Sequence, residues 1–130
     1  MRLSPAALAI LRSPAFAHVA LIDEHGRPHV TPMWIDVEGD ESIVINTAEG
    51  RVKARAFAVG TVVAISALDP STPYSYVMVR GTVVERTHEG AQDVIERLAE
   101  KYRGVRAFDS RGKQRVTVRI RPDHVVAHDV

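Results

Sequence analysis

The residues best suited to chemistry lie between positions 46 and 55, in the stretch Asn-Thr-Ala-Glu-Gly-Arg-Val-Lys-Ala-Arg. The stretch leaves a predicted buried strand and enters a predicted short helix, whose free backbone N–H groups attract anions. Thr47 adds a hydroxyl donor, Arg51 can hold a phosphate through two hydrogen bonds, and Lys53 adds a point charge. Each charge-assisted hydrogen bond contributes about 1.5–3 kcal/mol, so three or four would hold a phosphate firmly. On spacing alone, a plain basic surface helix remains the alternative.

The common catalytic motifs are absent from the sequence. It contains no Gly-x-Ser-x-Gly, no His-Glu-x-x-His, no P-loop and no Gly-x-Gly-x-x-Gly. It has no cysteine, which excludes disulfides, a thiolate nucleophile and a cysteine-ligated metal. His124 and His128 would share one face of a strand, but only Asp123 or Asp129 could add a ligand, so we expect no metal site. His18 lies in an apolar strand and is expected to be a core or interface histidine.

The composition describes a small chain close to electrical neutrality. Its 130 residues include 17 lysine plus arginine and 16 aspartate plus glutamate, a formal net charge of +1. This balance argues against a nucleic-acid binder, whose affinity depends on a concentrated basic face. The length fits one domain over residues 1–130. No apolar run could span a bilayer and residues 5–12 lack the flanks of a signal peptide, so we expect no membrane contact and a cytoplasmic location.

Turn residues and apolar periodicity divide the chain into short elements. Ser4 and Pro5 predict a helix start, a hydroxyl cap followed by proline, and Pro14 ends that helix. Apolar residues at three- and four-residue steps predict a longer helix over 89–103 that ends at Gly104. A short helix is predicted over 50–59, and strands over 16–23, 28–37, 42–47, 61–68, 74–86, 114–121 and 124–128. Because hairpins dominate this order, it favours a mostly antiparallel β-barrel decorated with helices.

Two of the predicted strands are apolar on both faces. Residues 61–68 and 77–84 carry apolar side chains at odd and at even positions, which predicts that both faces are buried. A barrel interior covers only one face, and three helices, two of them short, cannot cover much of the other. A second copy of the chain is the simplest cover, so the sequence predicts a homodimer.

Three segments of the sequence carry a resemblance to a known family. They are His-Val-Ala-Leu-Ile-Asp-Glu-His-Gly-Arg-Pro-His-Val-Thr-Pro-Met-Trp (18–34), the stretch 46–55 quoted above, and Tyr-Ser-Tyr-Val-Met-Val-Arg-Gly (74–81). Together and in this order they resemble the pyridoxamine-5'-phosphate-oxidase-like split-barrel superfamily, over essentially the whole chain. Within it the sequence is most similar to the deazaflavin (coenzyme F420)-dependent reductases. The C-terminus lacks the extended arginine- and tryptophan-bearing segment of true pyridoxamine-phosphate oxidases, so vitamin B6 oxidation is not expected.

The resemblance implies a six- or seven-stranded antiparallel split β-barrel of the FMN-binding type, homodimeric, with two cofactor sites at the subunit interface. The cofactor-binding residues that it implies form three groups: a phosphate group of Thr47, Arg51 and Lys53, a ring group of Pro32, Met33 and Trp34, and a group reaching across from the partner subunit, Tyr74 and Tyr76. For Trp34 and the tyrosines, hydrophobic interface packing remains a second interpretation.

The function implied by the resemblance is hydride transfer from reduced coenzyme F420 to an electrophilic unsaturated small molecule, such as an enone or a quinone. In such enzymes the cofactor carries the chemistry and the protein binds and orients it, which agrees with the missing catalytic motifs. No catalytic residue is identified, and no residue indicates a particular substrate. Two alternatives stay open: an FMN-dependent oxidoreductase of the same fold, and a non-catalytic carrier of a flavin, a deazaflavin or haem.

Overall fold

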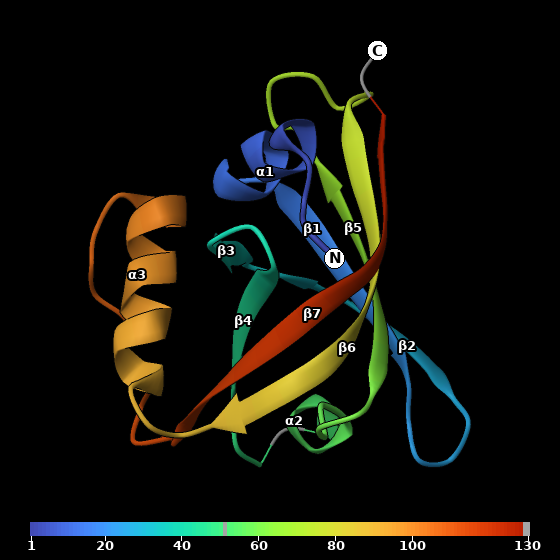
Figure 1. Ribbon diagram of the computed structural model, residues 1–130. Helices are drawn as coiled ribbons and strands as arrows, with labels where there is room; N and C mark the ends of the chain where they lie inside the picture. The colour runs from blue at the N-terminus through green and yellow to red at the C-terminus, as the bar shows by residue number, and fades with distance from the viewer. Residues whose placement is uncertain (51, 129–130) are drawn as a thin grey trace.

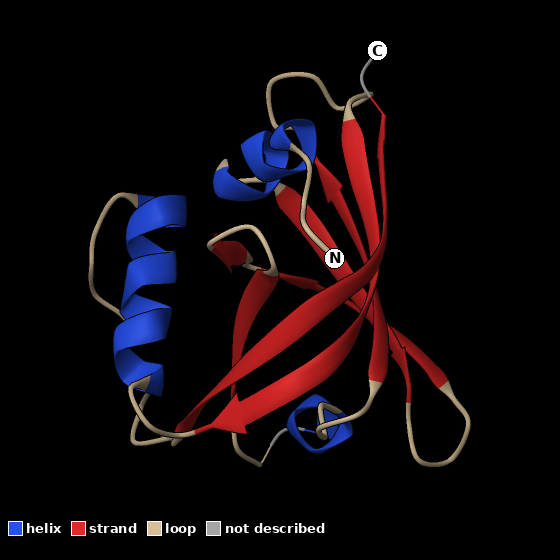
Figure 2. Ribbon diagram, in the orientation of Figure 1, coloured by secondary structure: helices blue, strands red, loops and turns tan. Residues whose placement is uncertain are grey.

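The computed structural model describes residues 1–50 and 52–128, with the backbone alone at Val52 and Lys53. Its elements in chain order are α1 (Pro5–Arg12), β1 (Phe16–Ile22), β2 (Pro28–Met33), β3 (Asp36–Glu38), β4 (Ser42–Ala48), α2 (Val52–Ala56), β5 (Val62–Leu68), β6 (Tyr76–Thr87), α3 (Ala91–Arg103) and β7 (Arg115–His128). Strands form the centre of the molecule and helices lie around them (Figure 2), as the sequence predicts.

The strands form one antiparallel sheet in the order β2-β1-β5-β6-β7-β4-β3. Only Trp34 and Ile35 separate β2 from β3 in the chain, yet these strands stand at opposite ends of the order. The sheet therefore curls until its two edges meet at these residues, where the described strands do not pair. This is a split barrel, and the prediction of that fold is confirmed with seven strands in the described part of the chain.

The core of the barrel comes from alternate side chains of its strands. Along β1 and β5 buried side chains alternate with more exposed ones, which is the period of a strand with one covered face. The helix α1 lies at one end of the barrel and α2 at the other (Figure 1). Leu11 of α1 and Phe57, just after α2, are buried in the core, and each contributes about 1.5–3 kcal/mol relative to an exposed position.

The two longer helices begin and end largely as predicted. The Ser4 hydroxyl accepts a hydrogen bond of 3.2 Å from the N–H of Ala7, and Pro5 occupies the first turn of α1. The amphipathic helix α3 packs its apolar face against Val44 on the outer side of β4, using Val94, Ile95 and Leu98. It ends at Gly104, whose φ of 79° is left-handed backbone that favours glycine.

Two predicted elements have different boundaries in the structure. The expected strand 28–37 is interrupted, because Trp34 leaves the sheet to stack on Tyr102 of α3, 5.5 Å away between ring centroids. The expected helix 50–59 shortens to α2, because Phe57 turns into the barrel core directly after it.

The predicted strands 114–121 and 124–128 are one continuous strand, β7. Pro122 suggested a break because proline lacks a donor for the ladder. In the structure the β6–β7 ladder shifts register between Arg80 and Gly81, opposite Pro122, and so continues past it. A Cβ on Gly81 would lie 2.6 Å from the carbonyl oxygen of Arg121, so only glycine permits this close approach.

The face of β2, β1, β5, β6 and β7 that points away from the core is largely apolar. We call it the outer apolar face; its members are Phe16, Ala20, Val30, Val62, Ala64, Met78 and Val126. Val30 is 67% exposed and Met78 is 51% exposed in the single chain. Residues 61–68 and 77–84 therefore bury only one face within the chain, and the partner subunit that would cover the other stays a prediction. No helix in the described part of the chain is long and apolar enough to cross a membrane.

Candidate functional site

A hollow of about 590 Å³ opens where β2 ends and the chain crosses to β3. We call it the β2–β3 hollow; its lining residues are Ala15, Phe16, Ala17 and His18 around the start of β1, Pro32, Met33 and Trp34 around the end of β2, Asn46 on β4, Ile95 and Tyr102 on α3, and Phe108 in the loop after α3. The lining is mostly apolar and aromatic and contains no carboxylate. Its size and chemistry are typical of sites for small organic molecules.

Three aromatic side chains form one wall of the β2–β3 hollow. The rings of Trp34 and Tyr102 stack with an interplanar angle of 9°, and Phe108 meets Trp34 edge-on at a centroid distance of 6.0 Å. The guanidinium of Arg103 lies 5.0 Å from the Trp34 ring centroid, and that of Arg115 lies 5.0 Å from the Phe108 centroid. Each aromatic pair adds about 0.5–1.5 kcal/mol beyond its buried area. The wall is therefore a packed cluster of aromatic rings.

Lys101 and Tyr102 hold α3 against the split in the barrel. Lys101 Nζ donates to the carbonyl oxygens of Leu11 at 2.6 Å and Ile35 at 2.5 Å, and lies 3.5 Å from an Asp36 carboxylate oxygen. The Tyr102 hydroxyl accepts a hydrogen bond of 3.3 Å from the N–H of Ile35. Ile35 lies at the break between β2 and β3, so both of its backbone polar groups find their partners on α3.

Burial changes the acidity of both groups. It lowers the pKa of Lys101, and the nearby Asp36 carboxylate partly opposes this effect. Burial also raises the pKa of Tyr102 to about 12. The Tyr102 hydroxyl therefore keeps its proton at physiological pH. It donates a hydrogen bond of 2.8 Å to the carbonyl oxygen of Ala15.

The raised pKa of Tyr102 predicts a loss of stability at high pH. The unfolded tyrosine loses its proton near pH 10 and the folded one at about 12, so between these values the folded state binds more protons and rising pH destabilises it. Allowing for solvent screening of a partly exposed group, we expect the free energy of unfolding to fall by roughly 1–2 kcal/mol through this group. Urea denaturation between pH 10 and 12 should show this component in the wild type and not in Tyr102→Phe. Equal pH slopes in the two proteins would contradict the assignment.

Asn46 forms the polar floor of the β2–β3 hollow and is 7% exposed. Its Nδ2 donates to the carbonyl oxygen of Ala91 at 2.9 Å and to Thr117 Oγ1 at 3.2 Å. Its Oδ1 accepts a hydrogen bond of 2.9 Å from Nε of the buried Arg115. Both amide hydrogens of Asn46 are therefore engaged within the chain, and the floor has a fixed orientation.

The three residues of the predicted ring group all line the β2–β3 hollow. Pro32 pairs with His18 across β1 and β2 and lies on the outward face of the sheet. Met33 packs against the barrel core, and Trp34 belongs to the aromatic wall. The structure thus brings these residues together at one site.

The predicted phosphate group is only partly within the described structure. Arg51 lies outside the described residues, as does the side chain of Lys53, whose backbone belongs to α2. Thr47 lies on the opposite face of β4 from Asn46, so it does not line the hollow. Its Oγ1 is buried and has no hydrogen-bond partner among the described residues. Because buried hydroxyls are normally paired, this atom is an orphaned donor beside the loop that leads to Arg51.

The chain on either side of Arg51 is held by Arg86 of β6. Arg86 Nη2 donates to a Glu49 carboxylate oxygen at 2.5 Å and to the Ala54 carbonyl oxygen at 3.2 Å. His88 Nε2 lies 2.7 Å from the other oxygen of Glu49. These contacts lower the pKa of Glu49, and the hydrogen bond from Arg86 contributes most. The connection from β4 to α2 is therefore fixed at both ends.

The tyrosines of the predicted partner-subunit group lie away from the hollow of their own chain. Tyr74 precedes β6 and is 77% exposed. Tyr76 begins β6, and its ring lies 5.2 Å from the His128 ring between centroids. Neither residue lines the β2–β3 hollow. Any contact with a cofactor would have to be made across a subunit interface.

Comparison with known protein families assigns the fold to a family. The family model described as pyridoxamine 5'-phosphate oxidase matches residues 3–129, almost the entire chain. The chain belongs to this family.

Solved structures agree with the family assignment. An F420 reductase is similar to this family member with 25% sequence identity, a TM-score of 0.81, and coverage of 95% of this chain and 98% of that chain. HupZ of Group A Streptococcus follows the same fold with 18% identity, a TM-score of 0.69, and coverage of 96% and 93%. An FMN-binding protein from Syntrophomonas wolfei does so with 10% identity, a TM-score of 0.66, and coverage of 96% and 85%. A comparison with curated proteins finds no match.

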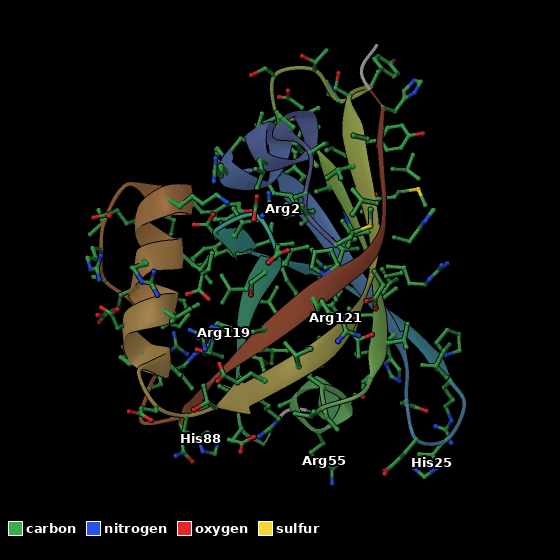
Figure 3. The ribbon with its side chains drawn as sticks, viewed as in Figure 1. Arg2, His25, Arg55, His88, Arg119 and Arg121 are labelled. Carbon is green, nitrogen blue, oxygen red and sulfur yellow. The ribbon has the colours of Figure 1, made fainter. Side chains whose placement is uncertain are left out.

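Two arginines of β7 in this pyridoxamine 5'-phosphate oxidase family member, the half-buried Arg119 and the exposed Arg121, have carboxylate partners within the chain. Arg119 contacts Glu38 at 2.6 Å and also pairs with Glu85, and Arg121 lies 2.9 Å from Asp123 (Figure 3). Their charges are therefore partly neutralised. Among the described residues, no group of three or more histidine, aspartate or glutamate side chains could hold a metal ion.

Several residues that line the hollow were not predicted as site residues from the sequence. Asn46 opened the stretch of interest but received no role, although a polar residue in a buried strand was a usable signal. Tyr102 was assigned only to the apolar face of its helix, and Phe108 lies in a loop that carries no pattern. His18 was expected in the core or an interface; the structure places it on the exposed face, so the core position is wrong.

Proposed function

We propose that the protein is an oxidoreductase that binds coenzyme F420 and passes a hydride from its reduced form to an electrophilic unsaturated small molecule, such as an enone or a quinone. The observation that carries the proposal is the β2–β3 hollow, where Pro32 and Met33 meet the aromatic wall to which Trp34 belongs. A planar tricyclic ring suits such a wall, because aromatic rings stack favourably on one another. The similarity to an F420 reductase supports the choice of cofactor.

The phosphate of the cofactor would be held by Arg51, Lys53 and Thr47. The orphaned Thr47 hydroxyl fits this role, since it is a donor for which the described chain supplies no acceptor. The contacts of Arg86 with Glu49 and Ala54 would keep this loop in place. The bound cofactor supplies the hydride chemistry, while the residues of the chain bind it, orient it and keep water from the hollow.

The protein would act as a homodimer in the cytoplasm. The outer apolar face exposes several large apolar side chains, and contiguous exposed apolar patches mark interaction sites. Pro32 and Phe16 line the β2–β3 hollow and also lie on the outward side of the sheet, so the hollow is continuous with this face. A partner docked there would approach the hollow, and Tyr74 and Tyr76 are the residues proposed to reach it.

Titration of the purified protein with coenzyme F420 and with FMN, side by side, tests the proposal. We expect F420 to bind more tightly, and the bound reduced cofactor to be oxidised by members of a panel of enones and quinones. Tighter FMN binding would favour the alternative of an FMN-dependent oxidoreductase, which the shared fold with an FMN-binding protein keeps open. Binding without turnover would indicate a carrier, and the absence of binding by both cofactors would refute the proposal.

A further inference from the structure

The reaction proposed above requires a proton as well as a hydride. Transfer of a hydride to one end of a conjugated carbon–carbon double bond breaks its π bond and forms a C–H bond. The electron pair moves to the carbonyl oxygen of the acceptor, which then has to be protonated. A proton donor within reach of that oxygen would lower the barrier, typically by a factor of about 10²–10⁴.

The β2–β3 hollow has two titratable side chains in its lining, Tyr102 and His18. The Tyr102 hydroxyl is already committed, because it donates to the Ala15 carbonyl oxygen at 2.8 Å and accepts from the N–H of Ile35 at 3.3 Å. Burial raises its pKa to about 12, so giving up the proton would leave an unfavourable buried phenolate. Tyr102 therefore builds the wall and is poorly suited to donate.

His18, unlike Tyr102, is exposed and has no partner among the described residues. It lies on β1 beside Pro32 of β2 and Ser66 of β5, on the exposed face of the sheet. It makes no hydrogen bond or ion pair with any residue that the structure describes, in contrast to His29 and His88, which contact Asp23 and Glu49 at 2.7 Å. Both ring nitrogens are thus available to a ligand and to water.

His18 also stands at a boundary between two depressions of the surface. It lines the β2–β3 hollow and a second hollow of about 280 Å³ on the outer apolar face. The charged or titratable groups that share these linings with it are Tyr102 in the first and Arg80 and His124 in the second. No carboxylate lies in either lining.

We propose that His18 is the catalytic acid of the β2–β3 hollow, donating a proton from a ring nitrogen to the carbonyl oxygen of the bound acceptor. Histidine suits this exchange because imidazole gains and loses protons near neutral pH. In sum, the acceptor gains one hydride from the reduced cofactor and one proton from His18, and the neutral imidazole regains its proton from water. The substrate is accordingly a planar acceptor whose double bond is conjugated to a carbonyl group, with that oxygen directed toward β1. This inference rests on the proposed function for its source of hydride.

The test compares His18→Gln with His124→Gln, a matched control that lines only the second hollow. With reduced F420 and menadione, a planar quinone, His18→Gln should lower kcat by about 10²–10⁴ with cofactor affinity unchanged and should lose the fall in rate at high pH. Added imidazole should restore part of the rate in His18→Ala. His124→Gln should keep the rate and the pH profile of the wild type.

A second measurement does not depend on turnover. Menadione added to the protein without cofactor should shift the NMR titration midpoint of the His18 ring and leave that of His124 in place. Unchanged kcat and pH profile in His18→Gln, or an unmoved His18 midpoint with menadione bound, would overturn the catalytic role alone. If the wild type oxidises neither reduced F420 nor reduced FMN, the proposed function is refuted, and the catalytic role of His18 is refuted as well.

Discussion

Replacing Arg51 and Lys53 together by alanine is expected to weaken coenzyme F420 binding by a factor of about 10²–10⁴, and to leave the protein folded. Each charge-assisted hydrogen bond contributes about 1.5–3 kcal/mol, so the loss of two corresponds to roughly 3–6 kcal/mol. Arginine and lysine are almost never fully buried in proteins, so we expect only a small change in stability. Isothermal titration calorimetry measures the affinity, and thermal unfolding checks the fold.

Arg55→Ala is the matched control for this experiment. Arg55 belongs to α2, as the backbone of Lys53 does, but its exposed side chain projects away from the barrel (Figure 3). It removes one positive charge from the same region, so it reports how much of the effect is general electrostatic attraction. We expect its effect to stay below tenfold and to disappear at high salt. An F420 affinity in the double variant equal to that of the wild type would refute the assigned phosphate site.

Local sequence patterns predict much of the fold. The cap at Ser4 and Pro5 and the apolar periodicity of 89–103 each depend on residues close together in the sequence, and both helices are found. The alternation of apolar residues and the turn residues between them predicted the antiparallel strands in the same way. Hairpin order also predicted an antiparallel barrel, whereas its assignment as a split barrel came from the family resemblance.

The boundaries that the sequence missed depend on distant contacts. Residues 28–37 read as one strand because nothing within them opposes extended backbone. The break at Ile35 exists because Tyr102, 67 positions later, bonds to its N–H and because Trp34 turns to stack on the same ring. Similarly, Pro122 predicts a break between two strands. The register shift at Gly81 of β6 explains why β7 continues past this proline.

The sequence likewise predicted only part of the candidate site. The ring group of Pro32, Met33 and Trp34 is consecutive, so its placement in one hollow follows once the strand is assigned. The wall and floor opposite are supplied by Tyr102, Phe108 and Asn46, which meet the ring group only after α3 packs on β4. No local pattern indicates such a meeting. A hollow that depends on tertiary packing therefore requires a structure, even where its first wall is visible in the sequence.

The outer apolar face leads to the second prediction with a large effect. Met78→Glu is expected to convert the proposed dimer into a monomer and to abolish tight F420 binding with it. Met78 lies in the middle of the face, paired with Ser66 of β5 and Val126 of β7. Burying an unpaired carboxylate in an apolar interface costs several kcal/mol, which raises the dissociation constant of the dimer by at least about 10³-fold. In the monomer the same side chain is half exposed, so the fold should lose less than about 1 kcal/mol.

Val84→Glu separates this effect from a general effect of charge on β6. Val84 lies on the same strand at its second register shift, is 45% exposed, and lines neither hollow. Sedimentation velocity at micromolar concentration should show a dimer for the wild type and Val84→Glu, and a monomer for Met78→Glu. F420 titration should follow the same division, because Tyr74 and Tyr76 can reach a hollow only from a second subunit. If the wild type is a monomer that binds F420 tightly, the β2–β3 hollow is a complete binding site within one chain, and the predicted dimer is refuted. The outer apolar face would then have to bind a different partner.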